Sequence, residues 1–124
     1  ELGAGRKDLR FMSKRSRDKG KRGEREAAAL FLEAIPDCKA RRGIQSRDGA
    51  EVPDVQTDLP FWIEVKRQKK PNIRAAMAQA IEACGDRQLW PIAVTKDDRG
   101  AWRVTLELSD FLDLVGEWWT MRRR

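Results

Sequence analysis

The sequence predicts an α/β domain with a mixed central β-sheet flanked by helices. Three observations support this fold class. Residues 61–66 alternate as a half-buried strand does, residues 89–95 are almost continuously apolar, and residues 23–35 and 72–84 carry helical apolar stripes. A chain of 124 residues has the size of one domain with a modest core. Because 40% of its residues are apolar and lie in periodic blocks, its composition is that of a folded protein.

The first helix is expected to begin near Gly23 and to end before Pro36. Its apolar stripe consists of Ala27, Leu30, Phe31, Ala34 and Ile35. Residues 1–22 show no apolar periodicity, so we expect a flexible basic arm over 1–22 and a folded domain over 23–124. Glu24 would stand at the top of the stripe, facing the sheet. An acid that favours a helix N-terminus is the simpler interpretation of this residue.

Three short strands are expected next. Residues 38–44 give a weak first strand, residues 45–51 a polar loop, and residues 52–55 a second strand segment. Residues 55–60 have the composition of a turn, which would fold the second segment against a third strand at 61–66.

The third strand would present two different faces, because successive side chains point to opposite sides of a strand. The two sets are Phe61, Ile63 and Val65 on one side, and Trp62, Glu64 and Lys66 on the other. A carboxylate and an ammonium group therefore point the same way from a half-buried strand. The dipeptide Pro53-Asp54 adds a second carboxylate close to it.

The second half of the chain begins with a helix over 72–84 that Gly85 would end. Its expected buried face consists of Ile73, Met77, Ala80, Ile81 and Cys84, with Gln79 beside it. Residues 89–95 predict a strand that is covered on both faces, and residues 96–100 a hairpin-like turn.

Residues 102–108 then alternate as a half-buried antiparallel strand, and Ser109 would cap a final helix. The segment Leu114–Trp119 of that helix is unusually apolar. It would pack either on the chain's own sheet or on a partner subunit, and the sequence leaves both possibilities open.

Positive charge is concentrated at the beginning of the chain. The formal net charge is +6; residues 1–25 carry ten basic and four acidic side chains, and the rest of the chain carries sixteen of each. Such an arm suits a polyanion such as DNA, because neutralised phosphates release their counterions. A solubilising tail is the alternative.

Several classes of site are excluded by composition. The chain has no histidine, and Cys38 and Cys84 have no metal-ligand spacing. A zinc site of the Cys/His kind and a His-based catalytic triad are therefore excluded. Two buried thiols in a cytoplasmic protein are expected. No apolar run reaches the length of a membrane span, so we expect no membrane partner.

Asp54 and Glu64 are candidate ligands of Mg²⁺, which prefers oxygen ligands and typically takes one or two carboxylates. Lys66 beside the cation would orient the attacking water and stabilise the transition state of phosphodiester hydrolysis. Each residue also has a simpler interpretation: Asp54 as a turn residue, and Glu64 with Lys66 as a surface ion pair. Their succession along the chain after Glu24 favours the catalytic interpretation.

Gly23-Glu24-Arg25-Glu26, Pro53-Asp54 and Ile63-Glu64-Val65-Lys66 together resemble the PD-(D/E)xK nuclease superfamily. Within it, the chain is most similar to the small archaeal- and phage-type Holliday junction resolvases, a similarity that includes the turn and strand at Gly100-Ala101-Trp102-Arg103. The resemblance covers about residues 20–110 and implies a restriction-endonuclease-like core, so that residues 23–124 would be a nuclease domain.

The resemblance also implies a set of site residues. Glu24, Asp54 and Glu64 would surround Mg²⁺, for which Mn²⁺ would substitute, and the main-chain carbonyl of Val65 would complete the metal shell. Lys66 would be the catalytic lysine. The expected DNA contacts are Lys21, Arg22, Arg25, Arg41, Arg42, Ser46, Arg47, Lys69 and Lys70. Arg25 and Ser46 are taken from the resemblance; for the arginines of the loop region, solvated surface charge is the alternative.

The implied function is a Mg²⁺-dependent, structure-specific endonuclease that cuts branched DNA in recombination and repair, with Holliday junctions as the leading substrate. Resolvases of this group act as homodimers that make paired symmetric cuts. The protein would work in the cytoplasm, near the nucleoid or, if phage-encoded, in a host cell. A flap, nicking or VRR-type repair nuclease, suggested by Gln79, and an inactive DNA-binding module are the alternatives.

Overall fold

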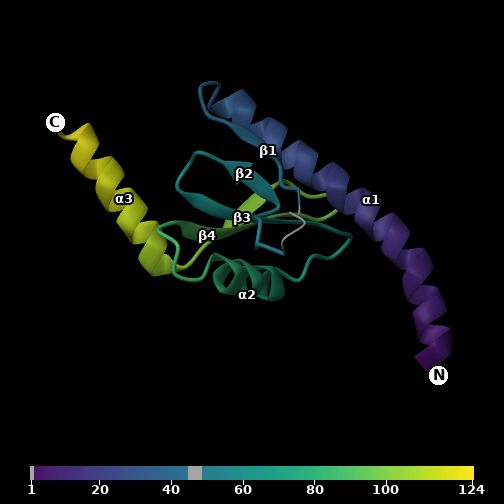
Figure 1. Cartoon of the computed structure of the whole chain (residues 1–124). Helices are drawn as coiled ribbons and strands as arrows, with labels where there is room; N and C mark the ends of the chain where they lie inside the picture. Colours follow the sequence, from purple (N-terminus) through teal and green to yellow (C-terminus); the bar gives the residue numbers. More distant parts are fainter. Residues whose placement is uncertain (1, 45–48) are drawn as a thin grey trace.

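The computed structural model describes residues 2–44 and 49–124, with the backbone alone for residues 2–13 and 16. Helices and strands follow one another in the expected order of helix, three strands, helix, two strands and helix (Figure 1). The elements are α1 (Leu2–Ala34), β1 (Ala40–Arg42), β2 (Val55–Thr57), β3 (Phe61–Arg67), α2 (Ile73–Cys84), β4 (Trp90–Lys96), β5 (Arg103–Thr105) and α3 (Leu108–Arg122). The predicted α/β class is confirmed.

The five strands form one mixed sheet in the order β1-β2-β3-β4-β5. The pair β3 and β4 is parallel, as its connection through α2 requires, and the other three pairs are antiparallel. In the register of β3 and β4, Glu64 lies opposite Ala93 and Lys66 opposite Thr95. The central position of β3 holds its side chains on a rigid, largely buried element.

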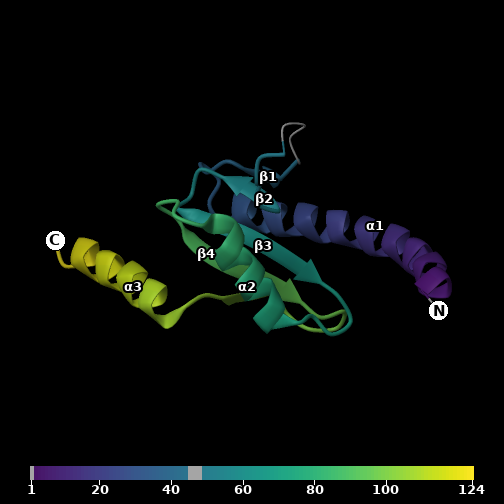
Figure 2. The same ribbon diagram turned by 60° about the horizontal axis from the view of Figure 1, so that its bottom comes forward.

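Helices α1 and α2 cover opposite faces of the sheet (Figures 1 and 2). On the α1 face, Ile63 and Val65 pack with Ala27 and Ala28 in the larger core cluster. On the α2 face, Trp62 packs in a second cluster, with Ala80 and Cys84. The predicted alternation of β3 is therefore confirmed, because the two sets of side chains enter two different cores.

The expectation that helical structure begins near Gly23 is wrong: α1 begins at Leu2 and includes residues 2–22, the described part of the expected basic arm. Glycine in a helix interior costs about 1 kcal/mol relative to alanine, and packing can offset this. A Cβ at Gly23 would lie 3.0 Å from the Cβ of Arg67. Gly23 therefore allows α1 to approach the end of β3, rather than marking a helix start.

Two ion pairs connect the middle of α1 with residues at the ends of β3 and β4. Lys19 contacts Asp98, which follows β4, at 2.6 Å, and Glu26 pairs with Arg67 at the end of β3. The part of α1 before Lys19 extends beyond the sheet, so that the N-terminus lies far from the C-terminus (Figures 1 and 2).

Two smaller expectations about α2 and β5 are also corrected. The buried face of α2 consists of Ala76, Ala80 and Cys84, whereas Ile73 and Ile81 are each 39% exposed. The strand expected at 102–108 is limited to Arg103–Thr105, the edge of the sheet. Gly85 ends α2 as predicted, with a positive φ of 58°. Asn72, which was expected to be the first helical residue, is instead the N-cap, and its side chain accepts the N–H of Ala75.

Helix α3 differs from the other two helices because none of its side chains is buried. Its N-cap is Glu107, not the expected Ser109, and Glu107 makes no capping hydrogen bond with its side chain. The helix extends away from the sheet (Figure 1). In the described part of the chain, Leu114–Trp119 therefore does not pack on its own sheet. No helix there is long and apolar enough to cross a membrane.

Candidate active site at the fork between β2 and β3

The candidate site lies where β2 and β3 separate, beyond the pair of Val55 and Ile63; we call this place the fork. Val55 of β2 pairs with Ile63 of β3, and the N–H of Asp54 donates to the carbonyl of Ile63 at 2.9 Å. Beyond this point, Val65 has no partner strand on that side. Its N–H donates instead to Oδ2 of Asp54 at 2.8 Å. The carboxylate of Asp54 thus closes the fork and is oriented by the backbone of β3.

Glu64 is the most unusual side chain of the fork. It is only 3% exposed, on the face of β3 that packs on α2. Its Oε1 accepts a hydrogen bond from Nε1 of Trp62 at 3.1 Å, whereas its Oε2 is buried and has no donor among the described residues. A buried carboxylate oxygen without a donor is costly, since the lost hydration is not replaced.

The surroundings of Glu64 raise its pKa to about 8. Burial is the main cause, and the hydrogen bond and negative charge of Asp54 add to it. The Trp62 hydrogen bond and the ammonium group of Lys66 act in the opposite direction and are weaker. Lys66 is therefore close enough to Glu64 to stabilise its charged form, as expected for neighbours on one strand face.

Glu24 reaches the same place from α1. Its Oε1 accepts from Nε of Arg42, the last residue of β1, at 3.0 Å, and its side chain is 19% exposed. Burial and the charge of Asp54 raise the pKa of Glu24, while Arg42 opposes the shift. Glu24 therefore faces the fork and not bulk water.

Asp54 is the central member of the set, because its carboxylate interacts with Glu24 on one side and with Glu64 on the other. The structure thus brings together all four side chains that were expected to be catalytic: Glu24, Asp54, Glu64 and Lys66. Val65 also lies in the fork. The expected role of its carbonyl as a ligand stays a prediction.

A small cavity of about 150 Å³ opens beside this set, lined by Glu24, Arg42, Gly43, Val52, Pro53 and Asp54. Gly43 is essential to its shape, because a Cβ there would lie 1.9 Å from the carbonyl oxygen of Pro53. The close approach of the two backbones is held by the N–H of Gly43, which donates to the carbonyl of Asp54 at 2.8 Å. Gly43 therefore sets the position of Asp54.

The residues present fit a divalent cation. Carboxylates are the ligands that Mg²⁺ prefers, it usually retains several waters, and one or two protein carboxylates suffice. Asp54 and Glu64 supply two adjacent carboxylates, and the orphaned Oε2 of Glu64 is an acceptor that a cation would satisfy. No three acids of the described residues converge closely enough to form a three-ligand group. Asp54 and Glu64 are therefore the candidate ligands of such a cation.

The expected DNA contacts are spread over a wider surface. Lys21, Arg22 and Arg25 are exposed on α1, and Arg41 is exposed on β1. Lys69 and Lys70 are exposed in the loop after β3. Arg42 is instead partly buried in its ion pair with Glu24. Ser46 and Arg47 lie outside the described residues.

Sequence reasoning missed the residues that position the acids. Trp62 orients Glu64, Arg42 holds Glu24, and Gly43 lets Asp54 enter the fork. The spacing of Trp62 and Glu64, two residues apart on one strand face, was the available signal for the first of these. The ring of Trp62 is also fixed by the guanidinium of Arg87, which lies 4.5 Å from the ring centroid.

Comparison of the chain with protein-family models, with curated proteins and with solved structures gave no match.

Proposed function

We propose that this protein is a divalent-cation-dependent endonuclease that cuts branched DNA, with four-way junctions as the leading substrate and a homodimer as the active form. The observation that carries the proposal is the position of Asp54 between Glu24 and Glu64, together with the buried, unpartnered Oε2 of Glu64. Perturbed carboxylates that gather in one place are typical of functional sites, because fold stability alone disfavours them.

Asp54 and Glu64 would hold the cation, with Glu24 acting directly or through water. A bound divalent cation would neutralise charge that develops on the phosphoryl oxygens. The chain itself supplies the orientation of its ligands: the N–H of Val65 fixes Asp54, and the indole of Trp62 fixes one oxygen of Glu64. Because these contacts exist before any ligand binds, little reorganisation is required for the site to act.

Lys66 would act on the water and on the phosphate. Its ammonium group is the positive charge closest along the chain to Glu64, and it is neither fully buried nor fully exposed. An ammonium group in this position donates hydrogen bonds to an attacking water and to the negatively charged transition state. Its charge therefore assists both the alignment of the nucleophile and the reaction itself.

Exposed basic side chains would bind the DNA backbone. Lys21, Arg22 and Arg25 follow one another on α1 close to Glu24, and Lys69 and Lys70 follow the end of β3. Phosphate contacts of this kind set affinity and register without reading sequence, which suits an enzyme that recognises the shape of a junction.

The test compares labelled four-way, flap and linear duplex DNA in Mg²⁺ or EDTA. We expect paired symmetric cuts in the four-way substrate and loss of cutting in Asp54→Asn and Lys66→Ala, with DNA binding retained. Asp86→Asn and Lys39→Ala change exposed residues elsewhere and are the matched controls. Cutting of flaps alone would indicate a repair nuclease. DNA binding without any metal-dependent cutting would contradict the proposed activity.

A further inference from the structure

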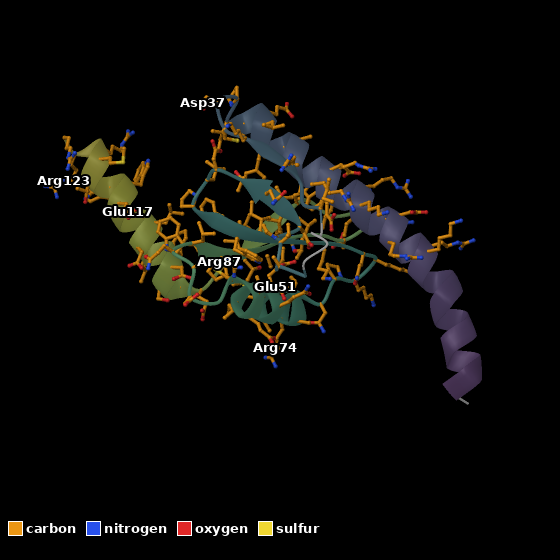
Figure 3. All side chains as sticks on the ribbon, in the orientation of Figure 1. Asp37, Glu51, Arg74, Arg87, Glu117 and Arg123 are labelled. Atoms are coloured by element: carbon orange, nitrogen blue, oxygen red, sulfur yellow. The ribbon has the colours of Figure 1, made fainter. Side chains whose placement is uncertain are left out.

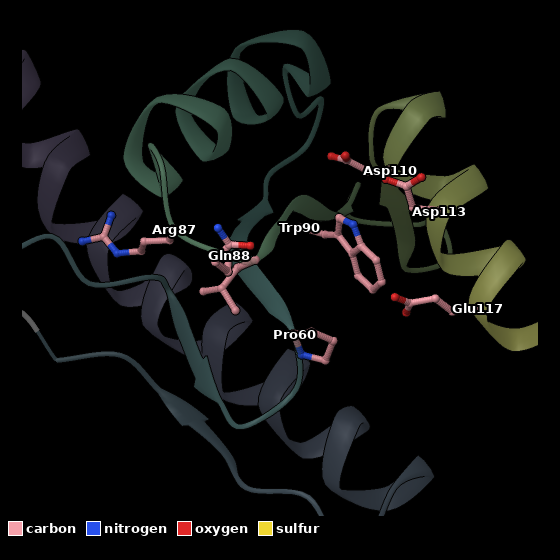
Figure 4. Close-up of a pocket in the computed structure, with 8 residues that line it drawn as sticks. Pro60, Arg87, Gln88, Trp90, Asp110, Asp113 and Glu117 are labelled. Carbon is pink, nitrogen blue, oxygen red and sulfur yellow. The ribbon is translucent and has the colours of Figure 1, made fainter. Parts of the chain in front are cut away.

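The polar and apolar sides of α3 are arranged in an unexpected way relative to the rest of the chain. Asp110, Asp113 and Glu117 face the body of the protein and line a groove of about 610 Å³, opposite Pro60 and Trp90 (Figure 4). Surface helices normally turn their apolar side inwards. Here the charged side of the helix faces its own chain, so the apolar side is left without a partner in the described structure.

The apolar side is a continuous stripe. Its members recur at intervals of three and four residues and are Leu108, Phe111, Leu112, Val115, Trp118 and Trp119. Their exposed fractions are 69, 46, 56, 37, 53 and 52%, respectively. Isolated exposed apolar residues are normal on proteins, whereas a contiguous patch of this size marks a surface that another molecule covers.

Charge is distributed unevenly along the same helix. Glu107 and Asp110 stand at its beginning, and Arg122, Arg123 and Arg124 at its end. Figure 3 shows Arg123 at the end of α3 that is remote from the sheet. If two copies of α3 pack antiparallel, the acidic beginning of each lies beside the basic end of the other. Parallel packing would place like charges together, which is unfavourable.

We propose that α3 is a self-association surface, on which the apolar stripe of one molecule packs antiparallel on the stripe of a second copy, with Val115 near the two-fold axis. Glu107 of each protomer then lies beside Arg122 of the other. This surface completes the homodimer proposed above, but it rests on α3 alone and does not require the metal site. A closed two-fold pair is also the commonest form of homo-oligomer.

The expected affinity of the dimer follows from the surface area that it would bury. A fully covered aromatic side chain buries about 150–250 Å². Covering the exposed halves of three aromatic residues and their aliphatic neighbours would bury on the order of 1,000 Å² in total for the two protomers, the lower limit of specific interfaces. The dimer should therefore dissociate within the micromolar range.

A membrane surface is the other partner that an apolar helix suits. Helices that lie in a lipid interface carry lysine and arginine on their polar side, which attract anionic lipids. The polar side of α3 instead carries Asp110, Asp113 and Glu117. The arginines of the helix are confined to its end. The carboxylates along its polar side therefore oppose binding to an anionic surface, whereas they do not hinder packing through the opposite stripe.

The experiment is sedimentation equilibrium of the full chain across the micromolar range, with circular dichroism as the check on folding. We expect a monomer–dimer equilibrium that Val115→Asp weakens at least about tenfold. Met121→Asp is the matched control, because Met121 is 71% exposed on α3 but lies outside the stripe. It should leave the dissociation constant within about twofold of the original. Neither substitution touches the core, since α3 buries no side chain.

Charge reversal tests the orientation. Glu107→Arg and Arg122→Glu should each weaken the dimer roughly threefold to tenfold, and the double variant should recover most of the loss. Failure of this rescue would overturn antiparallel packing.

A wild-type chain that stays monomeric, or equal weakening by Val115→Asp and Met121→Asp, would overturn the surface itself. A monomer that sediments with phosphatidylserine-containing vesicles would assign α3 to a membrane instead. A chain that dimerises through α3 but does not cut DNA would contradict the proposed nuclease function and leave the self-association surface standing.

Discussion

Glu64 in β3 and Asp98 in the turn after β4 are both acidic residues, yet they lie in contrasting surroundings. Asp98 is on the surface beside Lys19, and a hydrogen bond from that lysine lowers its pKa. Glu64 is buried beside a second carboxylate, and its pKa is raised to about 8. One of its oxygens has no donor in the described structure.

The two residues differ in how far their surroundings satisfy the charge of the carboxylate. A surface ion pair such as Lys19 with Asp98 is satisfied by its own partners and by water. At the fork, three carboxylates are opposed by Arg42 on one side and Lys66 on the other, and Glu64 remains incompletely satisfied. We therefore expect removal of the Glu64 charge to alter activity and stability in opposite directions, whereas changes at the surface pair should alter little.

The largest effect is expected from Glu64→Gln. Removal of a proposed ligand should lower cleavage of branched DNA about 100- to 1,000-fold, the size seen when one transition-state-stabilising group is removed. The metal-free variant should be at least as stable as the original at pH 8, because the amide replaces a buried charge and can donate to Asp54. Cleavage assays and urea unfolding in EDTA measure the two effects. Glu33→Gln on the exposed side of α1 is the control. Full activity in Glu64→Gln would remove this residue from the site.

The free energy of unfolding of the metal-free protein should depend on pH through the same residue, Glu64. Folded Glu64 keeps its proton up to a pKa of about 8, whereas the unfolded chain releases it near 4.5. Between these values the folded state binds more protons, so the free energy of unfolding should fall as pH rises, by on the order of 1 kcal/mol per pH unit at most. The raised pKa of Glu24 acts in the same direction.

Urea unfolding at pH 5, 6.5 and 8 in EDTA measures this slope. The difference between the original chain and Glu64→Gln isolates the contribution of Glu64. Parallel curves for the two proteins would contradict the raised pKa. Mg²⁺ should bind more tightly as pH rises towards 8, because it replaces the proton on Glu64.

Gly43→Ala should disturb the fork through the backbone. The added Cβ would overlap the carbonyl oxygen of Pro53, so the segment that carries Asp54 must move. We expect a loss of about 1–3 kcal/mol in the free energy of unfolding and a clear loss of cleavage. Thermal unfolding and the cleavage assay provide the measurements. Gly20→Ala, where a Cβ would meet nothing within 4 Å, should be neutral or stabilising.

A smaller effect is expected from Trp62→Phe. The phenyl ring keeps most of the packing but removes the donor to Oε1 of Glu64, which should cost about 1 kcal/mol of stability. Since this hydrogen bond lowers the pKa of Glu64, its loss should raise that pKa further and weaken Mg²⁺ binding at neutral pH. Calorimetric titration with Mg²⁺ measures the change. Trp90→Phe, in the groove beside α3, should leave metal binding unaltered.

The smallest effect on stability is expected at the surface ion pair of Lys19 with Asp98. Lys19→Ala should leave the unfolding midpoint within experimental error, because the partners of an exposed ion pair regain water when it is broken. Urea unfolding in low and high salt is the measurement. A shift comparable with that of Trp62→Phe would show that the contact of α1 with the β4–β5 turn is needed for stability.

Sequence patterns were sufficient for the order of the elements and for the two faces of β3. A strand has a period of two, so Glu64 and Lys66 must share a face wherever the strand lies. The end of α2 at Gly85 was also predicted from the sequence, because a glycine that ends a helix acts on neighbours within a few residues. The approach of Asp54 to Glu64 was expected from the turn-like residues 55–60, and the complete set with Glu24 was implied by the resemblance to nucleases. The structure brings these carboxylates together at the fork, with Glu24 reaching it from α1.

Other features depended on contacts between distant segments, and only the tertiary structure decided them. Gly23 appears as a helix start in the sequence, but the helix continues through it, and the missing side chain lets α1 approach Arg67. Arg42 and Gly43 stand together in an unremarkable basic segment, yet one pairs with Glu24 and the other makes room for the carbonyl of Pro53. Helix α3 has an amphipathic sequence, but its orientation relative to the sheet decides which side is covered. Local periodicity predicts which residues share a face of a helix or strand. Only the packing of elements that are far apart in the chain decides which residues that face contacts.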